Sequence, residues 1–195
     1  MAGYAEGMTV GDIALFEACS THWAGCVADA LSRGGRASVV DVDGRTPLHA
    51  MALGAGAWRE KDGRRALCCS AIVKKLVEAG ANIEALDENG NSALELAARS
   101  RQLTALGALI EAGAELRAAL LSVAGLSSSF ETVRMLVEAG ADPLARDSRG
   151  RSPLELCGKP WGEVDQAAFA YLEAAEIKAQ LASGDKARPA GAMRI

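Results

Sequence analysis

Apolar residues recur three and four positions apart in three segments of the chain, which is the spacing of one buried helix face. The segments are Ile72–Val77, Leu106–Ile110 and Val133–Val137. Each segment overlaps a phrase that contains Glu-Ala-Gly-Ala, as in LVEAGANIEA from Leu76. Because glycine adopts the left-handed cap conformation without strain, each phrase predicts the end of a helix.

A second phrase predicts where other helices begin. Its three copies are DGRTPLHAMA, NGNSALELAA and RGRSPLELCG, which start at Asp43, Asn89 and Arg149. The Asp-Gly or Asn-Gly pair predicts a tight turn, and the Thr or Ser that follows it is a typical N-cap residue. A Glu three residues after Ser92 and Ser152 adds a capping box. The chain is therefore predicted to repeat a turn, a short helix, a second helix and a capped end.

The repeat resembles that of the ankyrin-repeat family. Gly80 and Gly113 lie 33 residues apart, which is the ankyrin period. The stretch TPLHAMA from Thr46 is similar to the family signature T-P-L-H-x-A. The resemblance covers roughly residues 9–178 and implies an all-α solenoid of about five stacked helix-turn-helix units with short turn fingers. It also implies that His49 hydrogen-bonds the backbone of neighbouring turns, and that binding uses the side formed by the fingers and first helices.

The repeat pattern predicts a simple domain organisation. An N-terminal arm and a polar C-terminal tail flank the repeats at residues 1–8 and 179–195. The five predicted repeats occupy residues 9–40, 41–85, 86–118, 119–145 and 146–178. The first and last act as caps, which in a solenoid present a polar outer face. In the first repeat, Phe16 takes the place of the signature histidine.

Two repeats depart from the period. Gly34 and Gly80 lie 46 residues apart, so the second repeat contains an insertion, which we place near residues 53–68 between its two helices. Gly113 and Gly140 lie only 27 residues apart. The missing part is the turn, so the fourth repeat is predicted to lack its finger.

Composition excludes several classes of function. The net charge of −4 argues against a general nucleic-acid binder, and 4% aromatic residues argue against an aromatic-lined small-molecule cavity. Charged residues interrupt every apolar run, and the first twenty residues contain no basic leader. We therefore expect a cytoplasmic protein, with the nucleus as the alternative, that is neither secreted nor bound to a membrane.

The five cysteines offer the main candidate for metal chemistry. Cys19, His22 and Cys26 would share one face of a continuous helix and could bind zinc. However, the residues after Cys19 fall where the first repeat should turn, and no fourth ligand is evident. The adjacent Cys68 and Cys69 lack the CxxC spacing of a redox pair. We interpret the cysteines as reduced, buried packing residues and expect no metal or cofactor.

No catalytic constellation is apparent. The chain has only two histidines, and it contains no Gly-rich phosphate loop, HExxH or GxSxG motif. Glu95 and Glu155 are explained as capping partners rather than as a pair of catalytic carboxylates. The sequence therefore predicts a protein that is not an enzyme.

Candidate binding residues form two groups. Polar residues of the predicted fingers and first helices make up the first group: Arg45, Glu88, Asn89, Asn91, Arg99, Arg149 and Arg151. The insertion supplies the second group, Trp58 with Arg59, Arg64 and Arg65. Aromatic residues beside arginines are typical of interface centres. Two alternatives stay open: the first group is a solvated face, or Trp58 packs back onto the helices.

The function predicted from these observations is a non-catalytic protein–protein interaction module, an adaptor or structural subunit of a larger assembly. The alternative is a regulatory inhibitor that binds and masks an enzyme such as a kinase. A metal- or thiol-dependent enzyme is a third interpretation. The expected partner is a protein in a stable complex, and no nucleic acid, membrane or small-molecule substrate is expected.

Overall fold

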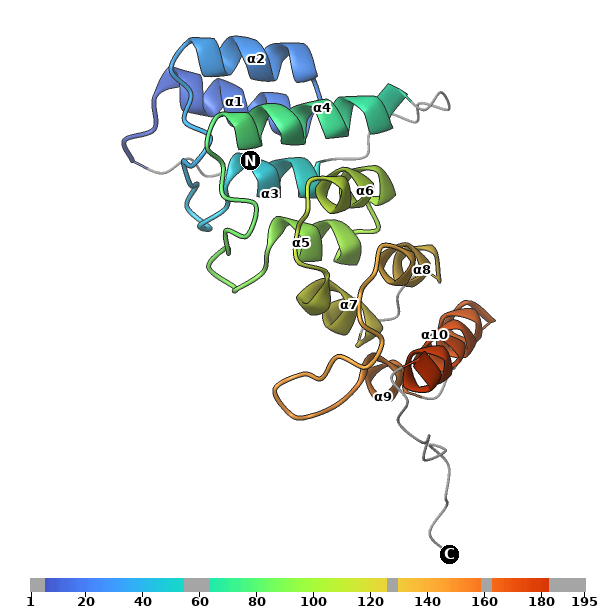
Figure 1. Ribbon diagram of the computed structural model, residues 1–195. Coiled ribbons are helices and arrows are strands. Elements are labelled where there is room, and N and C mark those ends of the chain that lie inside the picture. The colour runs from blue at the N-terminus through green and yellow to red at the C-terminus, as the bar shows by residue number, and fades with distance from the viewer. Residues whose placement is uncertain (1–5, 55–63, 126–129, 159–162, 183–195) are drawn as a thin grey trace, which may run out of the picture. The chain divides into compact units, whose positions relative to one another are not determined.

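The computed structural model describes residues 6–54, 64–125, 130–158 and 163–182; for residues 64–67 and 163–165 only the backbone is described. Within these ranges the chain forms ten helices (Figure 1). They are α1 (Val10–Ser20), α2 (Ala24–Ser32), α3 (Pro47–Leu53), α4 (Arg64–Glu78), α5 (Ala93–Arg99), α6 (Leu103–Glu111), α7 (Leu116–Ala124), α8 (Phe130–Glu138), α9 (Pro153–Cys157) and α10 (Glu163–Ala182). The only β feature in the described ranges is an isolated bridge between Leu86 and Ser92. The all-α prediction is confirmed.

The chain divides into two compact bodies, an N-terminal body of residues 1–119 and a C-terminal body of residues 120–195. In the N-terminal body the helices form two layers (Figure 1). The first helices of the repeats, α1, α3 and α5, pack side by side in one layer, and the second helices, α2, α4 and α6, form the other. The largest fully buried side chains lie between the layers: Leu15, Leu48, Met51, Ile72, Leu76, Leu94, Leu106 and Leu109.

Local capping determines where the first helices begin. The main-chain N–H of Ser92 donates to the Glu95 carboxylate at 2.8 Å, and the N–H of Glu95 donates to the Ser92 hydroxyl at 3.2 Å. Ser152 and Glu155 form the same pair of bonds, at 2.7 and 3.2 Å. Both predicted capping boxes are confirmed.

The first repeat contains a capping box that the sequence analysis did not identify. Thr9 caps α1, and its N–H donates to the carboxylate of Asp12 at 2.8 Å. Asp12 therefore occupies the place of His49, three residues after the cap, and the assignment of Phe16 to that place is wrong. The signal was available, because Thr-x-x-Asp is a capping pattern. Phe16 is instead a buried core residue, 5% exposed.

Two helices are longer than predicted. Helix α4 begins at Arg64 rather than near Cys69, so the insertion between α3 and α4 is shorter than the predicted residues 53–68. Helix α10 continues to Ala182, so the predicted polar tail of residues 179–195 starts inside a helix. The connection from α6 to α7 consists of residues 112–115 alone, which leaves no room for a finger.

The C-terminal body is built around α10. Helices α8 and α9 both pack against α10, and Val133, Leu136, Ala168 and Leu172 are buried. The rings of Phe130 and Tyr171 meet edge to face with centroids 5.6 Å apart.

Candidate protein-binding surface

Each finger begins with an aspartate that organises its backbone. The three fingers comprise residues 41–45, 87–91 and 147–151. Asp41 accepts hydrogen bonds from the N–H groups of Asp43 and Arg45, both at 2.9 Å. Asp87 and Asp147 accept the equivalent bonds from the residues two and four positions later, at 2.9 and 2.8 Å. The sequence analysis missed these aspartates, although each lies three residues before the glycine of its finger.

These hydrogen bonds favour the charged form of two of the finger carboxylates, Asp87 and Asp147. The main-chain N–H of Arg151 is the main cause that lowers the pKa of Asp147 below its ordinary value. Burial alone would raise the pKa of Asp87, but hydrogen bonds from Asn91 and Asn89 outweigh it and lower that pKa. Each of these two fingers therefore carries a permanent negative charge at its base near neutral pH.

His49 connects the first finger to the second. Its Nδ1 accepts the main-chain N–H of Thr46 at 3.1 Å, so the ring proton lies on Nε2, which donates to the carbonyl of Asn91 at 3.1 Å. Burial lowers the pKa of His49 and favours this neutral form. A main-chain bond from the N–H of Glu88 to the carbonyl of Asp43, 3.1 Å long, joins the fingers a second time. The structural role that the family resemblance implied for His49 is confirmed.

The predicted binding residues of the first two fingers differ in how far other residues of the chain already hydrogen-bond or pair with their side chains. Arg45 is half-buried and pairs with Asp43 at 2.7 Å. Asn91 accepts a hydrogen bond from Arg99 at 2.8 Å and also bonds to Asp87, so it mainly supports the finger. Glu88, beside Gly44, is exposed, as is Asn89. The structure thus places Glu88 next to Gly44, and Asn91 next to Arg99.

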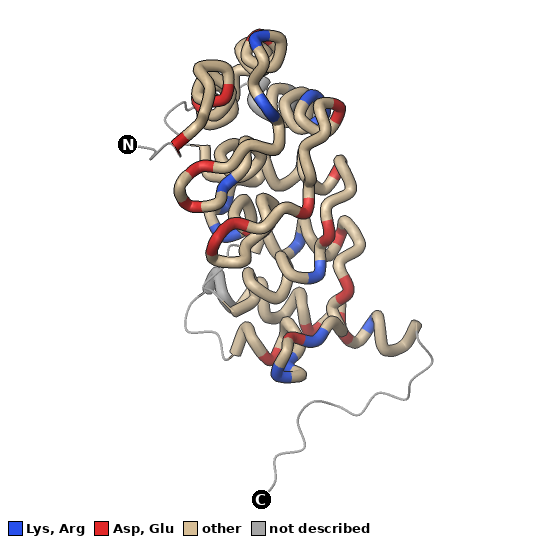
Figure 2. Tube along the Cα trace, turned by 90° about the vertical axis from the view of Figure 1, so that its left-hand side faces the viewer, with Lys and Arg blue, Asp and Glu red and all other residues tan. Residues whose placement is uncertain are grey.

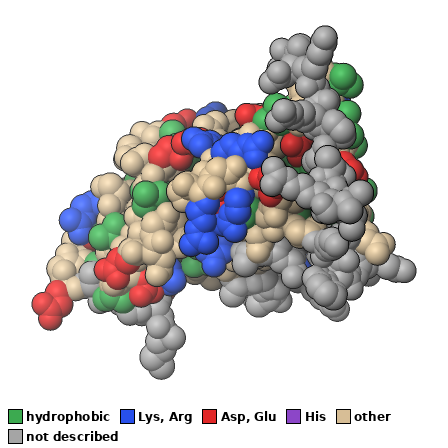
Figure 3. All heavy atoms as spheres, turned by 90° about the horizontal axis from the view of Figure 1, so that it is seen from below, with side chains coloured by type: hydrophobic (Ala, Val, Ile, Leu, Met, Phe, Trp, Pro, Cys, Tyr) green, Lys and Arg blue, Asp and Glu red, His purple; other side chains and the backbone are tan. Residues whose placement is uncertain are grey.

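The third finger belongs to the C-terminal body and has a different charge. Arg151 pairs with Asp147 at 2.8 Å, and Arg146 pairs with Glu155 at 3.0 Å. Arg149 is exposed at the tip. Acidic residues lie along the first two fingers (red in Figure 2), whereas the third finger contains Arg149 and Arg151. The first two fingers thus contain more acidic than basic residues, and the third contains more basic than acidic residues. Figure 3 shows a group of basic side chains (blue) on the face turned to the viewer.

The second predicted group lies largely outside the described residues. Trp58 and Arg59 are not among them. Arg64 and Arg65 form the first turn of α4, and only their backbone is described.

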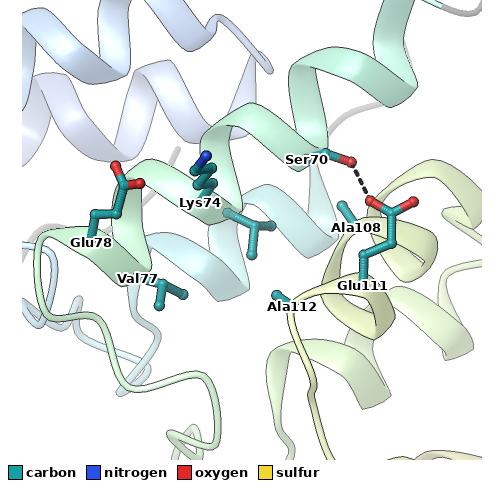
Figure 4. Close-up of a pocket in the computed structure, with 8 residues that line it drawn as sticks. Ser70, Lys74, Val77, Glu78, Ala108, Glu111 and Ala112 are labelled. Atoms are coloured by element: carbon teal, nitrogen blue, oxygen red, sulfur yellow. Dashed lines mark hydrogen bonds between the residues drawn. The ribbon is translucent and has the colours of Figure 1, made fainter.

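A shallow groove lies on the outer layer of the N-terminal body, between α4 and α6 (Figure 4). Its volume is about 330 Å³. Val73, Val77, Ala108 and Ala112 supply its apolar lining. At its edge the Ser70 hydroxyl donates to the Glu111 carboxylate at 2.9 Å (Figure 4). The groove is open and lies away from the fingers, so it is a separate feature of the surface.

The cysteines and His22 do not form a metal site. Helix α1 ends at Ser20 and His22 has a φ of 59°, so Cys19 and Cys26 lie on different helices. Burial raises the pKa of the Cys19 thiol to about 12, which makes it unreactive. Cys26 is exposed, so its interpretation as a buried packing residue is wrong. Within the part of the chain that the structure describes, no three His, Cys, Asp or Glu residues are grouped as metal ligands.

Glu176 of α10 is an unusual buried carboxylate in the C-terminal body. It is 8% exposed, and one of its oxygens accepts a hydrogen bond from Gln180 at 3.2 Å. Its second oxygen has no hydrogen-bond partner among the residues that the structure describes. Burial raises the pKa of Glu176, and this effect outweighs the charge of Arg146, which lowers that pKa. Such a group lowers the stability of the body that contains it.

Sequence comparison agrees with the arrangement of helices and fingers. A family model of a single ankyrin repeat matches residues 43–88, and a model of ankyrin repeats in three copies matches residues 66–147. No curated protein matches the chain. None of the described helices combines the length and the apolar character needed to cross a bilayer. Ankyrin repeats generally mediate protein–protein interaction and are typically not catalytic. The signature, the finger geometry and these matches show that the chain belongs to the ankyrin-repeat family.

Proposed function

We propose that the protein is a non-catalytic adaptor or structural subunit that binds a partner protein through its first two fingers. The observation that carries this proposal is the double link between them, from His49 to Asn91 and from Glu88 to Asp43. A surface that is rigid before binding loses little conformational entropy when the partner docks.

The chemistry of the fingers favours a partner with a basic patch. Asp43 and Glu88 belong to adjacent fingers joined by their backbones, and Glu88 is exposed. Arg45 neutralises part of the charge on Asp43, so Glu88 is the better candidate for an ion pair with the partner. Trp58 and its neighbouring arginines remain a second proposed contact on the sequence pattern alone.

Affinity purification followed by cross-linking tests the surface. Glu88→Lys should weaken capture of the partner about tenfold without changing the circular dichroism spectrum, because the side chain is exposed. Glu78→Lys on the outer layer makes the same charge change and should leave capture unchanged. Cross-links confined to α2, α4 and α6, or equal capture by both variants, would contradict the proposal.

The same purification separates the adaptor from the enzyme-masking inhibitor. An adaptor should elute on size exclusion in a constitutive complex with its partner. An inhibitor should show a free pool that lowers the activity of a captured enzyme when added back. We also propose a reducing compartment, the cytoplasm, because the five cysteines are odd in number and one of the buried thiols, Cys19, is unreactive.

A further inference from the structure

The outer face of α10 is apolar along most of its described length. One side of this helix is buried in the C-terminal body by Ala168, Leu172 and Glu176. The opposite side is exposed and carries Ala170, Ala174, Ile177 and Leu181. Ile177 is 50% exposed and Leu181 is 70% exposed. The last helix of a solenoid normally presents a polar face to water, so this apolar face requires a partner surface.

The spacing of this face is that of a coiled-coil seam. Residues 170, 174, 177 and 181 follow one another at steps of four, three and four, which are the d, a, d and a positions of a heptad. In the same frame Glu173 occupies a g position and Lys178 an e position. Both are exposed and they flank the seam on opposite sides.

The two charges select the orientation of the partner helix. In a parallel pair, a g residue of one helix lies beside the e residue five positions later in the other. Glu173 and Lys178 are separated by these five positions, so two identical helices in parallel would form two symmetrical ion pairs. An antiparallel pair would bring g beside g and e beside e, and would therefore place like charges together. The face is thus complementary to a parallel copy of itself.

We propose that α10 is a homodimerisation surface, on which a second copy of this chain packs in parallel along the seam of Ala170, Ala174, Ile177 and Leu181. The two-fold axis lies along the seam, so the same patch is used by both copies. The alanines allow close approach of the two helices, and the larger side chains bury their exposed area. The seam is short, so the dimer should be weak, with a micromolar dissociation constant. None of the seam residues belongs to a finger.

Sedimentation velocity of the full chain over a range of concentrations tests the proposal. The wild-type chain should pass from monomer to dimer as its concentration rises. Ile177→Glu should abolish the dimer and leave the circular dichroism of the monomer unchanged, because its side chain is exposed. Ala182→Glu places the same residue on the same helix outside the seam and should leave the dimer intact.

Charge reversal tests the parallel orientation. Glu173→Lys and Lys178→Glu should each raise the dissociation constant roughly tenfold, since each turns two attractive contacts into repulsive ones. The double variant should restore the wild-type constant. A chain that stays monomeric at all concentrations, a dimer that survives Ile177→Glu, or a double variant that is no better than the single ones would each overturn the proposal.

Discussion

The first and third fingers have the same backbone geometry but are integrated into the fold differently. In both, an aspartate accepts hydrogen bonds from the residues two and four positions later. In the first finger, His49 also reaches the carbonyl of Asn91 in the next finger. In the third, Glu155 holds the equivalent place, caps Ser152 and pairs with Arg146. The residue three positions after the helix cap thus determines whether a side chain links a finger to its neighbour.

The order of the repeats explains this difference. The histidine occurs in the second repeat, which is followed by a repeat with its own finger. The third repeat, whose first helix is capped by Ser92, is followed by a repeat without a finger, and in the third repeat Glu95 replaces the histidine. A carboxylate can complete its own cap, but it cannot donate a proton to a carbonyl of another finger. Five substitutions test how the repeats and their fingers are held, from the largest expected effect on stability to the smallest.

Leu94→Asp should have the largest effect, because it removes the packing beneath the second finger. Leu94 is 1% exposed, so the variant buries a charge without a partner and should lose about 4 kcal/mol of unfolding free energy. Urea denaturation followed by circular dichroism measures the loss. Leu86→Asp, at a side chain that is 61% exposed, is the control and should stay within about 0.5 kcal/mol of wild type. A Leu94→Asp protein with wild-type stability would contradict the position of α5 in the core.

Asp12→Ala should have the next largest effect, since Asp12 is the counterpart of His49 in the first repeat. The buried carboxylate accepts hydrogen bonds at 2.8 Å from the N–H groups of Thr9 and Arg36, and it pairs with the Arg36 guanidinium. Its loss should cost about 3 kcal/mol, because it leaves main-chain donors unpaired.

The same aspartate gives a pH signature. The Arg36 side chain holds the pKa of Asp12 well below its ordinary value. The stabilisation is therefore present at neutral pH and is lost as the pH falls below about 4, where the unfolded carboxyl takes up a proton. The difference in stability between wild type and Asp12→Ala should shrink over that acidic range. A constant difference would show that the ion pair contributes nothing.

His49→Ala and Glu155→Ala compare the two fingers directly. His49→Ala should cost about 2 kcal/mol, because it leaves the buried N–H of Thr46 without its acceptor and removes one of the two hydrogen bonds that the carbonyl of Asn91 accepts. Glu155→Ala removes only a helix cap and an exposed ion pair, and should cost about 1 kcal/mol. Hydrogen exchange should show faster exchange at the second finger in the histidine variant alone. Equal effects in both fingers would mean that the link to Asn91 adds no rigidity.

Glu176→Gln should have the smallest effect and the opposite sign. The native pKa of Glu176 is raised, chiefly by burial, so this carboxyl destabilises the folded chain once the pH rises above its unfolded pKa of about 4. The neutral amide should therefore slightly raise the melting temperature at pH 7, and the gain should vanish in acid. A variant that melts below wild type at neutral pH would show that the charged form is stabilised by other groups.

Much of the local structure was determined by the sequence alone. Some features depend only on residues that are close along the chain, so they can be predicted from the sequence. They are the Ser92 and Ser152 capping boxes, the glycines that end helices, and the ankyrin period. The capping pair of Thr9 and Asp12 and the aspartates of the fingers are local patterns of the same kind, so the sequence contains the signal for them too. Trp58 and the arginines of the insertion have no such local pattern, and they remain proposals.

Only the tertiary structure decided which side chains reach beyond their own repeat. The bond from His49 to Asn91 spans 42 positions, and the exposure of Cys26 depends on the turn that separates α1 from α2. Nor does the sequence show that Ile177 and Leu181 face water while Glu176 is buried. The physical reason is that burial depends on which helices pack together, whereas caps and periods depend on neighbours along the chain.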